Sequence, residues 1–179
     1  MRQATSELIP PLDPDGMPWI PAGPGKWFRP LRFTSDGWSE LIRLEPGSSV
    51  RRHRHTGEMH AINLAGSREI FSTGERVGPG DYVYEPAGTV DEWGAIGDEP
   101  CVVHIKVTGS IEYLGQNDQV IESVNAETRR ARYLDWCREH GVRPAEQILG
   151  LPVGTPVPVH GAEAQNHGLI LEGLDRYRC

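Results

Sequence analysis

The stretch GSSVRRHRHTGEMHAINLAG at residues 47–66 is followed at residues 80–93 by GDYVYEPAGTVDEW. In a β-strand alternate side chains share a face, so His53 and His55 point the same way, about 7 Å apart, and both can reach one ion. A site that is open for chemistry needs rigid elements to clamp it from more than one direction. Asp91, in the second stretch, is positioned to be the third ligand. The two stretches therefore predict a metal site inside a small β-barrel.

Two tight corners shape the second stretch. Residues 78–81 (Gly-Pro-Gly-Asp) predict a type II turn, in which Pro79 sets the first corner and Gly80 takes the positive φ that other residues resist. Residues 86–88 (Pro-Ala-Gly) form a second corner. We expect these bends to aim the strands that carry Glu85 and Asp91, so that glycine and proline set direction while the acidic residues supply chemistry.

The spacing of both stretches resembles the paired motifs of the cupin superfamily. The segments that carry the resemblance are G47-SSVRR-H53-R-H55 and G80-DYVYE-P86-A-G88-TV-D91. It implies an all-β fold, the cupin double-stranded β-helix or jelly-roll-like barrel. At the position where that superfamily usually carries its last histidine, this chain has Asp91.

A narrower resemblance, from about Leu44 to Val107, is to iron dioxygenases that cleave ketones. RHRHTGEMHAINLAG and YEPAGTVDEW are similar to 2,4'-dihydroxyacetophenone dioxygenase and, more distantly, to acetylacetone-cleaving dioxygenase. The resemblance implies a non-haem Fe(II) dioxygenase that uses O2 to cleave a carbon–carbon bond of a small hydroxy-ketone or diketone, aromatic by preference. Glu85 corresponds to a glutamate of the YEPAG-like segment and would orient water or take the substrate proton.

Two other classes of function stay open. One is a different metal-dependent cupin enzyme, such as an isomerase or hydrolase, and the other is a noncatalytic metal-binding cupin sensor. The metal is open as well: two imidazoles and one carboxylate with vacant octahedral positions are typical of Fe(II) oxygenases, but zinc, manganese or nickel would accept the same residues.

A fourth ligand and a substrate pocket are also predicted. Glu58, Met59 and His60 compete for the position where many cupins place a glutamate ligand, and we expect His60 to hydrogen-bond a metal ligand instead of the metal itself. The residues expected to line the pocket are one arginine, which would hold an anionic substrate group, and four apolar or aromatic side chains: Arg51, Met59, Phe71, Tyr84 and Trp93.

Turn residues separate short apolar stretches along most of the chain, as in antiparallel all-β domains. Strands are expected over 26–33, 37–44, 50–55, 59–64, 68–72, 82–85, 90–93, 101–107 and 110–114. One helix is expected over 126–140, with Asn125 as its N-cap and its arginines (129, 130, 132 and 138) facing solvent or a neighbouring subunit. The predicted single domain comprises a proline-rich arm (1–25), a barrel (26–115) and a C-terminal helix and tail packed on the barrel (116–179).

Composition and charge limit the classes of molecule that the chain is expected to bind. The chain has 179 residues and a formal net charge of −7, with its basic residues scattered, which disfavours nucleic acid and anionic membranes and favours small molecules. There is no charged start followed by an apolar run, so a cytoplasmic protein is expected. Cys101, Cys137 and Cys179 form no C-x-x-C pair and predict no disulfide framework or thiolate metal site. The exposed sheet and the arm favour a homodimer or homotetramer.

Overall fold

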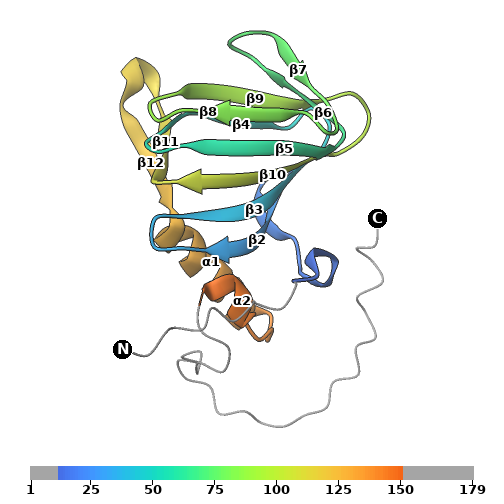
Figure 1. Ribbon diagram of the computed structural model, residues 1–179, viewed down its shortest axis with the longest axis vertical. Helices are drawn as coiled ribbons and strands as arrows, with labels where there is room; N and C mark the ends of the chain where they lie inside the picture. The colour runs from blue at the N-terminus through green and yellow to red at the C-terminus, as the bar shows by residue number, and fades with distance from the viewer. Residues whose placement is uncertain (1–11, 151–179) are drawn as a thin grey trace, which may run out of the picture.

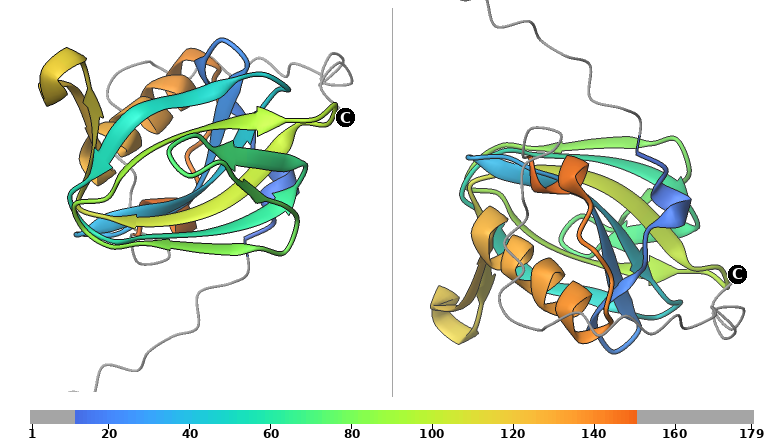
Figure 2. Two further views of the ribbon diagram at one scale, coloured as in Figure 1. Left: turned by 90° about the horizontal axis from the view of Figure 1, so that it is seen from above. Right: turned by 90° about the horizontal axis from the view of Figure 1, so that it is seen from below.

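The computed structural model describes residues 12–150, which form two antiparallel six-stranded sheets that face each other as a flattened barrel (Figures 1 and 2). One sheet has the order β1-β2-β3-β10-β5-β8 and the other the order β12-β11-β4-β9-β6-β7. The strands are β1 (Ile20–Gly23), β2 (Lys26–Phe33), β3 (Gly37–Leu44), β4 (Ser49–His55), β5 (Met59–Ala65), β6 (Ser67–Ile70), β7 (Glu75–Val77), β8 (Tyr82–Glu85), β9 (Val90–Ile96), β10 (Cys101–Thr108), β11 (Ser110–Leu114) and β12 (Val120–Asn125). The helical elements are η1 (Pro14–Gly16), η2 (Gln116–Asp118), α1 (Ala126–Glu139) and α2 (Glu146–Leu149).

The all-β barrel predicted from the sequence is confirmed, and β2, β3, β8 and β11 begin and end at the predicted residues. Three strands were not predicted. β1 contains a proline and ends in a glycine, β7 has only three residues, and most of β12 is exposed, so none of them carries a strong apolar alternation. The sheets therefore extend beyond residues 26–115 on both sides, and residues 20–23 of the arm pair with β2.

Strict alternation in β10 builds the centre of the core. Cys101, Val103, Ile105 and Val107 are all buried between the sheets, whereas Lys106 points outward and is exposed. His104 shares the outward face and lies 2.8 Å from Ser39 Oγ on β3. This is the arrangement that the period of two predicts.

The two predicted corners lie at the two ends of β8, and the second one leads into β9. The backbone N–H of Asp81 donates to the carbonyl of Gly78 (3.1 Å), and Gly80 has a φ of 90°, so the type II turn is confirmed. Gly88 also has a positive φ (91°). The chain therefore leaves β8 directly after Glu85 and returns in β9 one residue before Asp91.

Helix α1 covers the β2 end of the barrel (Figure 2) and starts where predicted. Asn125 accepts from the backbone N–H of Thr128, whose hydroxyl in turn accepts from the backbone N–H of Asn125, which is a capping box. The expectation that its arginines face solvent or a neighbouring subunit is wrong for Arg129, which faces the barrel of its own chain. That side chain is only 11% exposed and lies 3.0 Å from the fully buried carboxylate of Glu40 on β3.

Close packing of β3 on β10 explains Gly37, at the start of β3. A Cβ added there would lie 2.0 Å from the carbonyl oxygen of Val107. We expect Gly37→Ala to lower the free energy of unfolding by about 1–3 kcal/mol, because the backbone of both strands would have to shift. Urea unfolding measures this loss. Gly16→Ala is the matched control, since a Cβ there meets nothing closer than 3.7 Å, and an equal loss in both variants would contradict the explanation.

Residues 1–11 and 151–179 lie outside the described residues. They include the first part of the predicted arm, most of the C-terminal tail, and His160, His167 and Cys179. Within residues 12–150, no helix is long and apolar enough to cross a membrane.

Candidate metal centre and pocket

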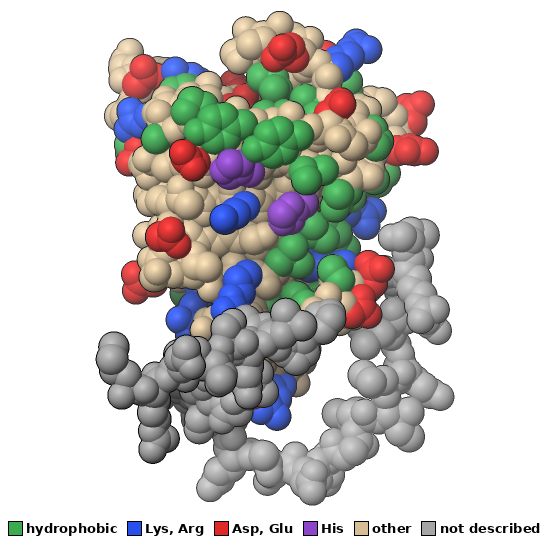
Figure 3. Space-filling view, viewed as in Figure 1, with side chains coloured by type: hydrophobic (Ala, Val, Ile, Leu, Met, Phe, Trp, Pro, Cys, Tyr) green, Lys and Arg blue, Asp and Glu red, His purple; other side chains and the backbone are tan. Residues whose placement is uncertain are grey.

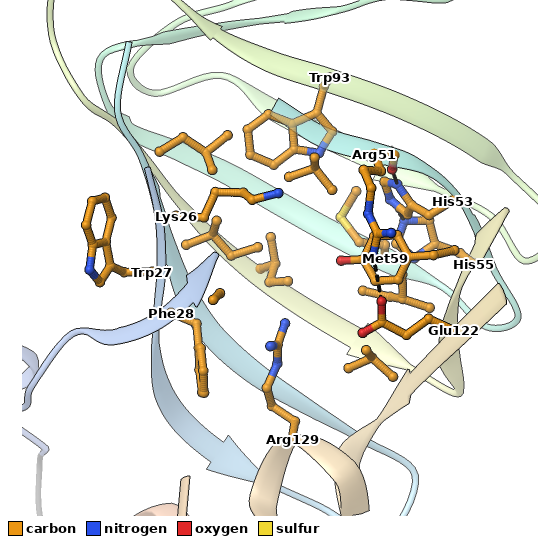
Figure 4. Close-up of a pocket in the computed structure, with 18 of the residues that line it drawn as sticks. Lys26, Trp27, Phe28, Arg51, His53, His55, Met59, Trp93, Glu122 and Arg129 are labelled. Atoms are coloured by element: carbon orange, nitrogen blue, oxygen red, sulfur yellow. Dashed lines mark hydrogen bonds and ion pairs between the residues drawn. The ribbon is translucent and has the colours of Figure 1, made fainter. Parts of the chain in front are cut away.

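A cavity of about 280 Å³ opens between the two sheets (Figure 4). Its walls combine apolar side chains from both sheets, among them Phe28, Met59, Trp93 and Ile105, with the imidazoles of His53 and His55. The cavity therefore brings the histidine pair of β4 and the apolar interior of the barrel into one space.

His53 and His55 point into this cavity from β4, as their shared parity predicts (Figure 4). Both are buried (3% and 2% exposed), and their Nε2 atoms are 3.1 Å apart. The neighbours of β4 in the sheet are β11 and β9, so the pair is fixed from both sides. Two imidazole nitrogens thus meet at a single point in the barrel.

The hydrogen bonds of His53 decide which of its nitrogens carries a proton. Its Nδ1 lies 2.8 Å from the carbonyl of Arg51, which can only accept, so Nδ1–H donates and the lone pair of Nε2 faces the cavity. Burial lowers the pKa of His53, although nearby Asp91 opposes that shift. Burial and the neighbouring His53 also lower the pKa of His55 to about 3. Both rings are therefore neutral at pH 7, the form that binds metals.

Glu85, at the end of β8, lies against this pair. Its carboxylate oxygen Oε2 is 3.2 Å from His55 Nε2, and the residue is 5% exposed. Burial and the negative charge of Asp91 raise the pKa of Glu85 to about 8, while Arg68 acts in the opposite direction. In the metal-free protein Glu85 consequently carries a proton at pH 7.

Asp91, on β9, is paired in register with His53 and is also buried (3% exposed). Its Oδ1 accepts a 2.7 Å hydrogen bond from the backbone N–H of Glu92, whereas its Oδ2 is buried without a hydrogen-bond partner. The side chain therefore lies inside the barrel, where one of its oxygens is free to take a positively charged partner.

As the side chains stand, no three His, Cys, Asp or Glu residues within 12–150 are gathered as a complete metal cluster. The pair itself fits a divalent metal: two neutral imidazoles converge beside the buried carboxyl groups of Glu85 and Asp91, and within residues 12–150 neither carboxyl group forms an ion pair with an arginine or lysine. His53 and His55 could thus hold an ion together with either carboxylate. Glu85 is the nearer donor, whereas the sequence pointed to Asp91.

Of the five residues predicted to line the pocket, Arg51, Met59 and Trp93 do so, while Phe71 and Tyr84 do not. Tyr84 is 47% exposed on the outer face of β8, because Glu85 next to it takes the inward position. Phe71 follows the end of β6 and is 49% exposed. Both placements predicted from the sequence are wrong.

His60 also lies outside the site. On β5, Met59 and Ala61 point inward, so His60 between them points outward, where its Nδ1 lies 2.6 Å from the Tyr82 hydroxyl. Figure 3 shows histidine and hydrophobic side chains gathered on this outer face, over β8, β5 and β10. The predicted contact of His60 with a metal ligand is therefore wrong. Among the three competing positions only Met59 faces the cavity, since Glu58 pairs with His60 outside.

Sequence reasoning missed a buried arginine behind the site. Arg68 on β6 is 1% exposed, its guanidinium lies over the Trp93 ring (4.7 Å), and its charge acts on both Glu85 and Asp91. Burial lowers the pKa of Arg68, and the two carboxylates oppose that shift. The sequence did contain a signal for this arginine, because Arg68 occupies an inward-facing position of the short strand 67–70.

Residues 11–110 match the family model of the ChrR cupin-like domain. The chain belongs to this cupin family. The match spans β1 to the start of β11, and it includes every residue of the histidine pair and both carboxylates. No curated protein matches this cupin in sequence.

Solved structures share the fold. An RmlC-like cupin protein from Ralstonia eutropha JMP134 is 26% identical, with a TM-score of 0.74 over 80% of this cupin and 96% of that chain. A second R. eutropha JMP134 protein with a cupin-like fold is 20% identical (TM-score 0.71, 90% of this chain and 100% of that one). An acetylacetone dioxygenase from Acinetobacter johnsonii is 16% identical (TM-score 0.63, 75% of this chain and 96% of that one). The last two likenesses show the fold alone.

The proton on Glu85 gives metal binding a specific pH dependence. If Glu85 becomes a ligand it must lose that proton, so metal affinity should rise about tenfold per pH unit from about pH 6.5 to 8 and then level off. Histidine protonation does not contribute in this range, because the pKa values of both rings are lowered. Titration with Zn²⁺ at several pH values measures the slope. In Glu85→Gln the slope should vanish; an unchanged slope would exclude Glu85 as a ligand.

Proposed function

We propose that this cupin is a non-haem Fe(II) dioxygenase that cleaves a carbon–carbon bond of a small oxygenated ketone, aromatic by preference. The observation that carries the proposal is the pair of neutral imidazoles at the wall of the cavity, whose Nε2 atoms lie 3.1 Å apart beside the buried carboxyl group of Glu85. A likeness in fold to an acetylacetone dioxygenase adds that a barrel of this shape accommodates such chemistry.

In this proposal His53 and His55 hold the metal, and a carboxylate from Glu85 or Asp91 completes a two-histidine, one-carboxylate set. Such a set leaves positions open and is typical of non-haem iron oxygenases, while zinc, manganese and nickel accept the same donors. The chemistry that iron would supply is the activation of dioxygen and the polarisation of a chelated ketone. With one carboxylate the site keeps a charge of about +1, which favours a substrate that binds as an enolate.

The protein's own groups would bind and orient the ketone. Met59, Trp93 and Ile105 supply an apolar wall that excludes water from the histidine pair. Whichever of Glu85 and Asp91 does not bind the metal stays within the same buried site. Glu85 suits the transfer of a proton, because its raised pKa of about 8 lies near the working pH.

Metal analysis combined with an oxygen electrode tests the proposal. We expect protein purified without added metal to contain iron and to consume one O2 per molecule of an acetophenone that carries its hydroxyl group on the carbon next to the carbonyl, with both oxygen atoms recovered in the two carboxylic acid products. Parallel assays with β-diketones define the substrate range. Iron-loaded protein that consumes no oxygen with any of these ketones would contradict the proposal.

A noncatalytic metal-binding function is the second candidate. The specific observation behind it is that the sequence matches the ChrR cupin-like family over residues 11–110, whereas the likeness to a dioxygenase is one of fold alone. Tight binding of zinc with no oxygen uptake would support this candidate, and ketone-dependent oxygen uptake would exclude it.

A further inference from the structure

Positive charge collects on the walls of the cavity, although the whole chain has a net charge of −7. Among residues 12–150, Glu122 is the only acidic residue that lines it. The cationic side chains that line it are Lys26, Arg51, Arg68, Arg129 and Arg132. A cationic cavity attracts anionic ligands even when the net charge of the whole chain is negative.

Protein carboxylates form ion pairs with two of these cations: Arg129 lies 3.0 Å from Glu40, and Arg51 lies 2.6 Å from Glu122. Arg68 forms no ion pair among the described residues, but it is only 1% exposed, lies over the Trp93 ring, and is acted on by the charge of Asp91. Among the described residues, no carboxylate lies within salt-bridge distance of Lys26 or Arg132. Arg132 is exposed and donates to the carbonyl of Pro21 (2.6 Å). Lys26, which is half-buried, is therefore the unpaired cation that a ligand in the cavity can reach most readily.

Lys26 is held with its ammonium group inside the cavity. It starts β2, is half-buried, and reaches toward the same space as Arg51 (Figure 4). Its Nζ donates one hydrogen bond, to the carbonyl of Ser49 (3.1 Å), which leaves two of its three N–H donors for a ligand. Burial and the positive charge of Arg51 lower its pKa, whereas the negative charge of Glu122 acts in the opposite direction, as the charge of a bound anion would.

We propose that the cavity selects ligands that carry a carboxylate, with Lys26 binding that group and the histidine pair facing the other end of the ligand. Because it assigns the substrate class of the same site, this inference rests on the proposed function. The ligand would be a small aromatic acid with a ketone. Phe28, Trp93 and Tyr113 offer flat apolar surface for the ring, and about 280 Å³ accommodates a single ring with short substituents.

Glu122 provides a second test of the proposal, because it competes with a ligand carboxylate for the same positive charges. Its carboxylate is bound to Arg51 at the edge of the cavity, and it also acts on the charge of Lys26. Glu122 therefore offsets part of the positive charge that would attract a ligand carboxylate. Removing its charge should strengthen the binding of an anionic ligand.

A pair of nearly isosteric ligands, 4-acetylbenzoate and its neutral amide 4-acetylbenzamide, tests the proposal by isothermal titration calorimetry. We expect the wild-type protein to bind the acid about tenfold or more tightly than the amide, as a charge-assisted hydrogen bond implies. Lys26→Met should remove most of this preference and Lys26→Arg should retain it. Glu122→Gln should increase the affinity for the acid but not for the amide.

Lys106→Met is the matched control, because Lys106 is exposed on the outer face of β10 and is the only other lysine in the chain. It should bind both ligands as the wild type does. Equal binding of acid and amide by the wild type, binding of neither, or an equal loss of both in Lys26→Met would overturn the proposal. If Lys26→Met fails to fold, the absence of tighter acid binding by Glu122→Gln would overturn it as well.

The calorimetric readout needs no turnover, so the two proposals can fail separately. A preference for the acid that depends on Lys26, without any oxygen uptake, would leave this inference standing and remove the dioxygenase. Oxygen uptake with neutral and acidic ketones at equal efficiency, together with equal binding of both, would support the dioxygenase and remove the inference about Lys26.

Discussion

Replacing His53 with alanine is expected to weaken metal binding by more than about a hundredfold, since losing even residues that only orient metal ligands costs ten- to a hundredfold. The reason is geometric: one of the two nitrogens that converge in the cavity disappears, and the carboxylates on β8 and β9 face a single imidazole. Anaerobic calorimetric titration with Fe(II) or Zn(II) measures the change.

His60→Ala is the control for this variant. His60 is seven residues from His53 in the sequence but lies on the outer face of β5, beside Tyr82. It should therefore bind metal with wild-type affinity. Full metal binding by His53→Ala, or a comparable loss in His60→Ala, would show that the ion binds elsewhere.

Replacing Arg129 with methionine should lower the free energy of unfolding by about 3–5 kcal/mol, the cost of leaving a buried charge without its partner. Arg129 joins α1 to the barrel through the carboxylate of Glu40, which is fully buried in β3. Urea unfolding at pH 7 measures the loss. The double variant Glu40→Leu/Arg129→Met should recover most of it, because no charge then remains buried.

The loss in Arg129→Met should depend on pH. Burial raises the pKa of Glu40 and the charge of Arg129 opposes that shift, so without the arginine the pKa rises further. A carboxyl with a raised pKa in the folded state favours the protonated form, so stability is lost as the pH rises above the unfolded value of about 4.5. The variant should be closer to the wild type at pH 5 than at pH 8. A loss that is equal at both pH values would contradict this explanation.

The positions of the histidine pair and the core were predictable because they follow from a period of two. In β10, inward residues alternate with outward ones along the whole strand, which fixes the apolar run from Cys101 to Val107. In β4 the pairing with β9 is irregular between Val50 and His53, but the alternation from His53 to His55 places both histidines on one face. The glycine and proline corners marked the ends of β8 for the same local reason.

The residues that were misplaced needed the register of a second strand. His60 and Tyr84 are partners across β5 and β8, and each is next to an inward residue, Met59 or Glu85. Because neighbouring residues of a strand face opposite ways, the inward position of Met59 would have placed His60 on the outer face of the barrel. Arg129 could not be placed from the helix alone, because its partner Glu40 is 89 residues away, although a glutamate in the middle of the apolar strand β3 was a signal.

The homodimer or homotetramer expected from the exposed sheet stays a prediction. The exposed apolar side chains on the outer faces of β5 and β8, namely Ile62, Leu64, Tyr82 and Tyr84, are where a second copy would first be sought.

A crystal structure of the iron-loaded protein, with anomalous diffraction recorded at the iron edge, tests the central claim most directly. We predict one anomalous peak per chain, about 2.0–2.3 Å from the Nε2 atoms of both His53 and His55, with an oxygen of Glu85 or Asp91 at a similar distance. A peak elsewhere in the protein, or no peak although iron is bound in solution, would contradict the assignment of the cavity as a metal centre.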